Sequence, residues 1–399
     1  MLKTLLCLII IVLISFNLHS VSNFAAIFTL FNPSAENLAF GLDAGTADIW
    51  HRNPLSVWSN PAKLGYYKGL SFGYSRDAWL DKVDVLNDLY HNSSYLSFGW
   101  KGIGISLPFV NNNQKFGTIL DLGEQVQTDE NGNYLGTYNP YETCSEFAVG
   151  VNTLEFLANL SENSFKDNIY NLSYYTDLSL GYSFNYIFSD LVLEGTVQPE
   201  QDVKLKAKSH FHNIGLIARV SPFNSQNYEI LNIDFTGGIK YLNISEEKIN
   251  YPNSGSDANP LPYGTKTAIS GRLALNLEDM LSKSTLLNNP ANNFISSFCK
   301  DLLSIYASYE ENKYGDRSTE YDKGVEFGLL NIFYLRSGEH SDNYGLSGKI
   351  SGYGINLSYK NWFHLQYNHV SFPGGGLQET QEKSDYMINV NILKIIENI

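Results

Sequence analysis

The clearest structural signal in this chain is the run at residues 177–188, which reads DLSLGYSFNYIF. Apolar and polar residues alternate along it, and the apolar face carries Leu178, Leu180, Tyr182, Phe184, Tyr186 and Phe188. Successive side chains of a β-strand point to opposite faces, so this alternation predicts a strand with one apolar and one polar face. The run is about eleven residues long, which is the length that a tilted strand needs to cross the hydrocarbon core of a membrane.

The same alternation recurs along the chain from Leu70 onward. Further examples lie at residues 231–241, 303–309, 363–367 and 386–392. Their apolar faces carry essentially no charge, as expected for a lipid-facing wall, where Lys or Arg at mid-bilayer costs about 2–4 kcal/mol. Counting such runs predicts an all-β fold, a transmembrane antiparallel β-barrel of about 14 strands over residues 68–399. A soluble all-β protein is the alternative, since it shows similar faces on strands that are usually shorter.

Composition fits a barrel and argues against binding to nucleic acid. Charged residues make up 17% and aromatic residues 14% of the 399 residues. The mean hydropathy of -0.20 excludes a helical membrane protein, whereas a barrel wall combines a lipid-facing half with a polar lumen-facing half. The formal net charge is -14 and no Lys/Arg-rich run occurs, so the basic surface that nucleic-acid binding requires is missing.

Residues 1–22 have the features of a cleaved export signal. A positive start at Lys3 precedes an apolar run from Leu5 to Phe16, and a small-x-small site ends at Ser22. The apolar run is too short for a spanning helix, which needs about 20 residues. We therefore expect cleavage after Ser22 and a final location in the outer membrane, in contact with its lipid.

Residues 23–67 differ from the rest of the chain. They alternate poorly and contain Gly41, Gly45, Pro54 and Pro61. Gly and Pro are disfavoured inside strands. We therefore predict that this segment is a hatch that fills the barrel lumen.

No motif indicates an enzyme, a cofactor site or a metal site. His210 and His212 are two positions apart and have no carboxylate or third ligand nearby in the sequence. The G-x-S-x-G pattern of a nucleophile elbow does not occur. Once Cys7 is removed with the export signal, Cys144 and Cys299 remain, either as a disulfide or as two separate thiols.

Two stretches resemble a known superfamily. Gly41 and Gly45 in the run AFGLDAGTAD, followed by Asn60, Pro61 and Ala62, are similar to the N-terminal hatch of FadL-like outer-membrane transporters and of the related PorV/PorQ proteins. Near the other end, residues 324–327 (GVEF), 334–338 (YLRSG) and 352–355 (GYGI) resemble the closing strands of PorV/PorQ-type barrels. Together the two stretches bracket the predicted mature chain.

This resemblance implies a 14-stranded barrel with an N-terminal hatch and one of two roles. The first is a component of type IX secretion whose partners are secretion-system proteins or secreted cargo. The second is a FadL-like channel for hydrophobic ligands, which would need an apolar binding region and an opening in the wall or hatch. The resemblance also implies that Glu326 and Arg336 face the lumen and pair with each other or with the hatch.

Overall fold

The structure is a computed structural model that describes residues 25–78, 89–110, 115–128, 133–161, 163–191, 205–223, 230–251, 258–276, 301–315, 317–342, 347–359, 362–373, 380–391 and 394–395. The predicted export signal at residues 1–22 and Cys299 lie outside the described residues. Cys144 is buried and forms no disulfide within the described part of the chain.

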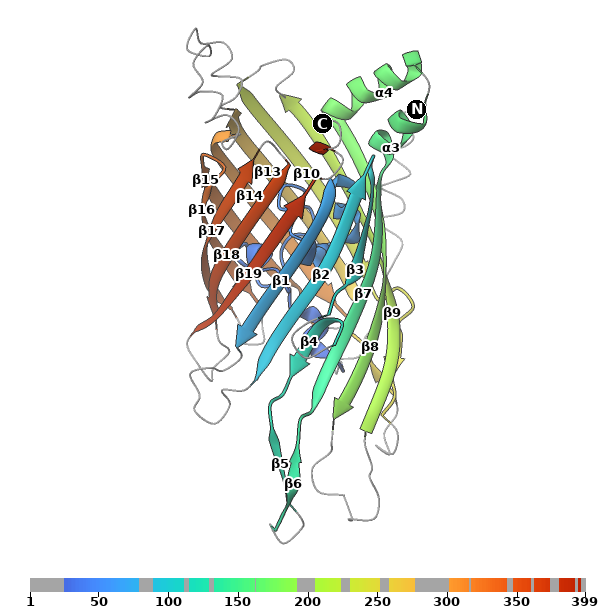
Figure 1. Ribbon diagram of the computed structural model, residues 1–399, viewed down its shortest axis with the longest axis vertical. Coiled ribbons are helices and arrows are strands. Elements are labelled where there is room, and N and C mark those ends of the chain that lie inside the picture. The colour runs from blue at the N-terminus through green and yellow to red at the C-terminus, as the bar shows by residue number, and fades with distance from the viewer. Residues whose placement is uncertain are drawn as a thin grey trace.

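One antiparallel sheet closes on itself to form a barrel (Figure 1). β1 (Gly69–Ala78) pairs with β2 (Tyr90–Trp100) on one side and with β19 (Thr380–Val390) on the other, which closes the ring. The other wall strands are β3 (Ile103–Pro108), β4 (Gly117–Asp121), β7 (Tyr141–Asn152), β8 (Thr176–Leu191), β9 (Leu205–Phe223), β10 (Leu231–Leu242), β13 (Gly264–Asn276), β14 (Asp301–Tyr314), β15 (Glu320–Leu329), β16 (Phe333–Ser341), β17 (Gly348–Tyr359) and β18 (Phe363–Pro373). β3 and β4 share one position between β2 and β7, so the described residues form fourteen strands around the circumference. The predicted all-β barrel and its strand number are confirmed.

The distribution of polarity across the wall is that of a membrane barrel. Along β15 every second residue is buried. The buried set includes Asp322 and Glu326, whereas the outward set includes Val325 and Phe327, which are 54% and 45% exposed. Burying carboxylates while exposing large apolar side chains is unfavourable in water but expected where the outer face contacts lipid. This distribution rejects the soluble alternative.

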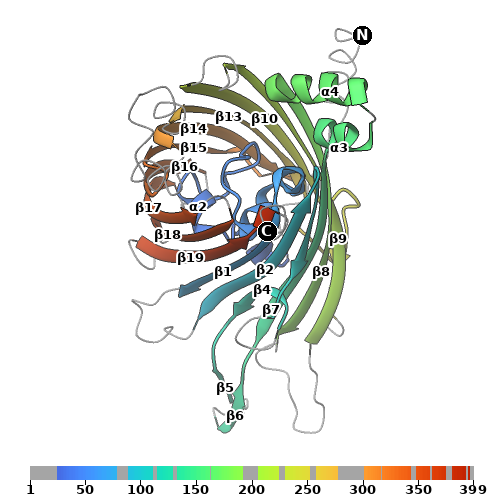
Figure 2. The ribbon, with the colours of Figure 1, turned by 45° about the horizontal axis from the view of Figure 1, so that its top comes forward.

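The N-terminal residues 25–67 lie inside the ring of strands (Figure 2). They contain four short helices, which are η1 (Ile27–Leu30), α2 (Ala35–Leu38), η2 (Pro54–Ser59) and η3 (Pro61–Tyr66). We call residues 25–67 the hatch. Two longer helices, α3 (Thr153–Leu160) and α4 (Asn163–Tyr175), connect β7 to β8 at the rim of the barrel. None of the helices in the described ranges is long and apolar enough to span a membrane.

The two ends of the barrel differ. We call the end where β1 begins and β19 finishes the terminal end, because the last described residues, 394–395, follow β19 there. The opposite end carries a two-stranded sheet of β11 (Lys248–Ile249) and β12 (Asn259–Pro260) and the hairpin of β5 (Gln125–Thr128) and β6 (Tyr134–Tyr138). The β5–β6 hairpin projects beyond the wall (Figure 1), and we call this end the hairpin end.

Candidate functional site

Two Asn-Pro turns shape the second half of the hatch. The side chain of Asn53 accepts a hydrogen bond from the Leu55 amide at 3.1 Å, and that of Asn60 accepts one from the Ala62 amide at 3.0 Å. In each case the next residue is proline at the first helical position, where its fixed φ suits a helix start and its missing N–H costs nothing. The sequence Asn60-Pro61-Ala62 therefore starts η3 through local chemistry alone.

Asn60 also connects the hatch to the wall. Its side-chain Nδ2 donates to the Thr46 carbonyl at 2.8 Å. The same group lies 3.3 Å from the carbonyl oxygens of Leu216 on β9 and Ile239 on β10. Asn60 is fully buried, so its amide satisfies backbone groups that would otherwise lack a partner.

A row of wall glycines lies beneath η3, and the sequence analysis missed it. Neighbouring strands place these residues directly opposite one another, in the order Gly69, Gly99, Gly104, Gly150, Gly181 and Gly215. A Cβ at Gly150 would lie 2.7 Å from the Pro61 carbonyl oxygen, and a Cβ at Gly181 would collide with the Ala62 amide. We call these six residues the glycine track. The hatch lies against five of them, from Gly99 to Gly215, at a distance that no residue with a Cβ atom permits, whereas Gly69 lies against the end of β19.

Gly41 and Gly45 of the hatch face the opposite part of the wall. Their φ angles are 149° and 111°, values that side chains with a Cβ rarely adopt. The amide of Gly45 donates to Glu310 on β14 at 2.9 Å, and a Cβ on Gly41 would collide with Asp322 on β15. These two predicted hatch glycines therefore lie where the hatch touches the wall.

Glu326 and Arg336 face the lumen and lie opposite each other on β15 and β16. Arg336 Nε donates to Glu326 Oε2 at 2.7 Å, and its Nη2 lies 3.1 Å from Glu36 Oε1 of the hatch. Its Nη1 donates to the Asn368 side chain at 2.7 Å. The charged groups in these ion pairs are at least 96% buried. Each charge has lost its contact with water, and its ion-pair partners offset that free-energy cost.

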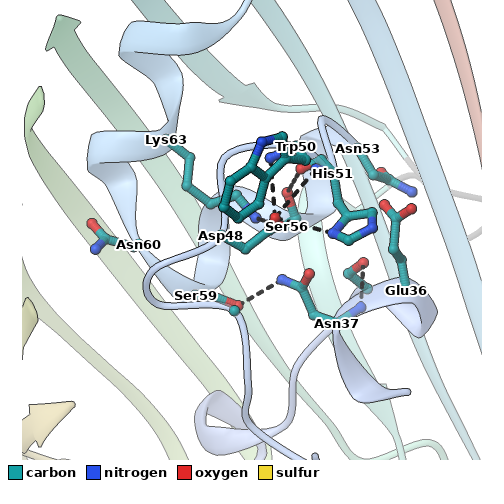
Figure 3. A network of polar contacts seen from close by, with 12 residues as sticks. Glu36, Asn37, Asp48, Trp50, His51, Asn53, Ser56, Ser59, Asn60 and Lys63 are labelled. Carbon is teal, nitrogen blue, oxygen red and sulfur yellow. Dashed lines mark hydrogen bonds and ion pairs between the residues drawn. The ribbon is translucent and has the colours of Figure 1, made fainter. Parts of the chain in front are cut away.

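The same chain of charges continues through the hatch (Figure 3). His51 Nε2 lies 3.1 Å from Glu326, and His51 Nδ1 lies 3.0 Å from Asp48. Asp48 in turn accepts a hydrogen bond from Lys63 Nζ at 2.7 Å. We call Glu36, Asp48, His51, Lys63, Glu326 and Arg336 the charge relay, in which acidic and basic groups alternate.

This alternation keeps the buried hatch groups ionised. Burial alone would lower the pKa of His51, but the carboxylates of Asp48 and Glu326 outweigh it and raise that pKa to about 10. Burial alone would raise the pKa of Asp48, but His51 and Lys63 lower it below its usual range. Both groups are therefore charged at neutral pH.

Further wall residues hold the hatch by hydrogen bonds. Glu310 accepts from the amide of Thr46 at 2.9 Å and from its hydroxyl at 2.6 Å. Lys240 donates to the Trp58 carbonyl at 2.5 Å, and Asp385 accepts from Ser34 at 3.3 Å. The glycine track thus supports one side of the hatch, and charged side chains together with further wall glycines, such as Gly324 against Phe40, contact the other.

Part of the lumen between the hatch and the hairpin end is filled by apolar side chains. Buried side chains from hatch, wall and the β11–β12 region form one cluster, which includes Phe28, Trp58, Tyr95, Leu120, Cys144, Ile187, Phe211, Leu261 and Tyr263. We call it the apolar lumen cluster.

The wall is interrupted beside this cluster. β3 pairs with β7 as far as Ser106 and Ala148, and β4 takes over only at Thr118 and Cys144. Between them Leu107 and Pro108 stay paired with β2 and Val110 bridges Phe116, but neither segment pairs with β7. Residues 145–147 of β7 therefore have no ladder partner on this side within the described ranges.

Aromatic side chains surround this interruption on both faces. Phe109 and Phe116 are 45% and 53% exposed on the outer face. On the inner face the Tyr95 hydroxyl, from β2, lies 3.3 Å from Thr118 of β4 and donates to the Cys144 carbonyl of β7 at 3.3 Å. The Tyr95 side chain therefore closes the interruption from inside.

The two predicted histidine positions give no metal site. The rings of His210 and His212 lie 5.6 Å apart on β9, and His212 contacts the Tyr182 hydroxyl at 2.5 Å. No group of three or more His, Cys, Asp or Glu side chains in the described part of the chain is arranged to hold a metal ion.

Comparison with known proteins identifies similar folds but no family. No protein-family model matches the chain, and no curated protein matches it. Among solved structures, the TodX deltaS2S3 mutant, a monoaromatic hydrocarbon channel, is 9% identical with a TM-score of 0.40, covering 88% of this chain and 97% of that one. The toluene transporter TbuX of Ralstonia pickettii is 11% identical with a TM-score of 0.35, covering 90% and 98%. A FadL homologue of Pseudomonas aeruginosa is 8% identical with a TM-score of 0.34, covering 93% and 98%. The likeness is confined to the general architecture of an outer-membrane barrel, and these structures do not confirm the finer resemblance to PorV/PorQ proteins.

Proposed function

We propose that this protein is an outer-membrane channel that passes hydrophobic small molecules through its side wall. The observation that carries the proposal is the interruption in the pairing with β7 between β3 and β4, which lies beside the apolar lumen cluster and is closed by Tyr95. An apolar solute gains roughly 25 cal/mol for each Å² that it removes from water. The cluster on the inside and Phe109 and Phe116 on the outside therefore offer it apolar contacts on both sides of the wall, with Glu146 as a buried polar group between them.

The hatch favours a lateral route over an axial one. The glycine track and the charge relay contact the hatch on two sides of the lumen. Displacing the hatch would separate buried charges, at a cost of about 3–5 kcal/mol for each pair broken. Turning the Tyr95 side chain breaks only two hydrogen bonds of 3.3 Å, each worth about 0.5–1.5 kcal/mol. Turning the Tyr95 side chain therefore costs less free energy than displacing the hatch, and we propose Tyr95 as the gate.

The test changes the size of the side chain at position 95. Cells that make the wild-type protein, Tyr95→Ala or Tyr95→Trp are given radiolabelled toluene or oleate, and accumulation is compared with cells that lack the protein. We expect Tyr95→Ala to accumulate more label and Tyr95→Trp less. Leu335→Ala, which shortens an apolar side chain 66% exposed on the outer face of β16, is the matched control. Equal accumulation in all these cells, at the level without the protein, would exclude the proposal.

A role in secretion is the second candidate, and the β5–β6 hairpin favours it. The hairpin projects from the barrel (Figure 1) and exposes Val126 and Tyr134 to 64% and 67%. Exposed apolar side chains on a projecting strand pair suit contact with a protein partner. The test is gentle extraction in detergent followed by mass spectrometry. A stoichiometric protein that the Val126→Asp/Tyr134→Asp variant no longer retains would support secretion, whereas bound hydrophobic compounds without such a protein would support the channel.

Two further points remain proposals. We propose that residues 1–22 direct export and are removed, and that residues 23–67 are a permanent hatch. N-terminal sequencing of the protein isolated from outer membranes tests the first point, with Asn23 as the expected first residue.

A further inference from the structure

A separate cavity of about 320 Å³ lies at the terminal end of the lumen, between the hatch, β1, β17, β18 and β19. Ten described residues line it, and none of them is Asp or Glu. Arg52 and Lys68 come from the hatch side, His364 from β18 and Lys394 from the C-terminal residues. In a protein with a formal net charge of -14, a cavity lined by three permanent cations and no carboxylate is a local reversal of charge.

Arg52 is the best-placed binding group. It is exposed to the lumen although it lies between the buried residues His51 and Asn53. No ion pair joins its guanidinium to a carboxylate in the described part of the chain. Among the charged groups around it, Glu155 attracts its charge, whereas Arg272 and Arg219 repel it. Because Glu155 is not among the lining residues, an anion inside the cavity would stabilise a guanidinium that has no ion pair there.

The remaining lining groups can donate hydrogen bonds or charge to the same anion. Lys68 is 57% exposed, with Glu155 at 3.6 Å as a partner on its solvent side. The Nε2 of His364 is buried and has no hydrogen-bond partner among the described residues. The Asn389 side chain, which donates to the Lys68 carbonyl at 3.1 Å, fixes the backbone at the floor of the cavity.

We propose that this cavity binds a phosphate-type oxyanion. A phosphate group carries about -1.5 to -2 charges and three acceptor oxygens, which suits cationic donors that converge from several directions. A carboxylate has one charge and two oxygens and would therefore offset less of the positive charge and accept fewer hydrogen bonds. The guanidinium of Arg52 supplies the paired donors that phosphate accepts. The phosphate can come from a free phosphate or phosphorylated solute, or from a lipid headgroup at the rim.

This site is independent of the proposed passage of hydrophobic molecules. The cavity lies at the terminal end, whereas the apolar lumen cluster and the wall interruption lie toward the hairpin end. Loss of phosphate binding therefore leaves the test on Tyr95 unaffected, and the reverse also holds.

The experiment is calorimetric titration of the detergent-solubilised full chain with inorganic phosphate at constant ionic strength. We expect saturable binding that Arg52→Gln weakens by roughly tenfold or more, since a charge-assisted bidentate contact is lost. The phosphate affinity of Arg52→Lys should lie between those of the wild type and Arg52→Gln. Lys313→Gln, which removes an exposed charge at the hairpin end of β14, is the control and should bind like wild type. Protection of the hatch from protease in Arg52→Gln shows that the fold is intact.

Parallel titrations with sodium acetate and with short-chain phosphatidic acid below its micelle concentration assign the ligand. Binding of phosphatidic acid, sensitive to Arg52→Gln, together with weak binding of free phosphate, indicates a lipid headgroup as the source. Tighter binding of free phosphate indicates a soluble source. Acetate binding as tight as phosphate binding overturns the assignment, as does the absence of saturable binding or equal affinity in wild type and Arg52→Gln.

Discussion

Replacing Arg336 with methionine should destabilise the contact between hatch and wall far more than the loss of an ordinary charge. The side chain keeps a similar length and apolar stem, but three contacts of 2.7–3.1 Å to Glu326, Glu36 and Asn368 disappear. Glu326 and Glu36 then remain buried with one cation fewer between them. Breaking a buried pair in this way costs about 3–5 kcal/mol. His51 still contacts Glu326, and Gln366 still contacts Glu36, so we expect a value near the lower end of that range.

The assay is equilibrium unfolding by urea of the protein refolded in lipid vesicles, with fluorescence of the hatch residues Trp50 and Trp58 as the signal. The matched control is Lys323→Met on β15, which removes a charge that is 60% exposed and pairs with Glu339 at 3.2 Å. An exposed pair contributes about 0–1 kcal/mol. Trypsin cleavage after the buried Lys63 reports the hatch separately. If Arg336→Met costs no more than Lys323→Met and leaves Lys63 equally protected, the charge relay does not hold the hatch.

Three further predictions concern the glycine track, pH and the buried thiol. Gly181→Val should displace η3 or block folding, because its Cβ collides with the Ala62 backbone. Gly237→Ala on β10, where the nearest atom lies 4.0 Å from the added Cβ, should fold normally. Protease protection of the hatch distinguishes the two variants, and equal protection would contradict the close contact. The raised pKa of His51 means that its charged form stabilises the hatch fully below pH 6.5 and that this contribution is lost as pH rises through about 10; His51→Asn should abolish that loss between pH 8 and 11, and an unchanged profile in the variant would refute it. Cys144 is fully buried behind Tyr95, so a maleimide should label it slowly in wild type and at least about tenfold faster in Tyr95→Ala; equal labelling rates would show that Tyr95 does not close the interruption.

The pairing of Glu326 with Arg336 could be predicted from the sequence, but the other partners of these two residues could not. The two residues stand the same distance on either side of a tight turn, so an antiparallel hairpin places them opposite each other on one face. Glu36 and His51 are 300 and 275 residues away from the side chains they contact. No local pattern reports such a contact, because it depends on where the hatch sits in the closed barrel.

The glycine track was also predictable only in part from the sequence. Each glycine is visible in its own strand, and an isolated glycine in a strand already suggests close approach of another backbone. That six of them line up depends on the register of five successive strand pairs, which loop lengths and bulges set over long distances. The interruption between β3 and β4 was missed because the short apolar run at residues 103–110 resembles an ordinary strand.

The sequence by itself determined the all-β barrel and its strand number, because alternation of period two is a property of consecutive residues. The hatch motif around Asn60 and Pro61 stays a prediction from a resemblance, and the Asn-Pro turns within it form through local contacts. The tertiary structure alone decided which wall residues clamp the hatch, where the wall is interrupted, and that Arg52, Lys68, His364 and Lys394 surround one cavity. These features arise from closure of the ring, which brings together residues that are hundreds of positions apart in the chain.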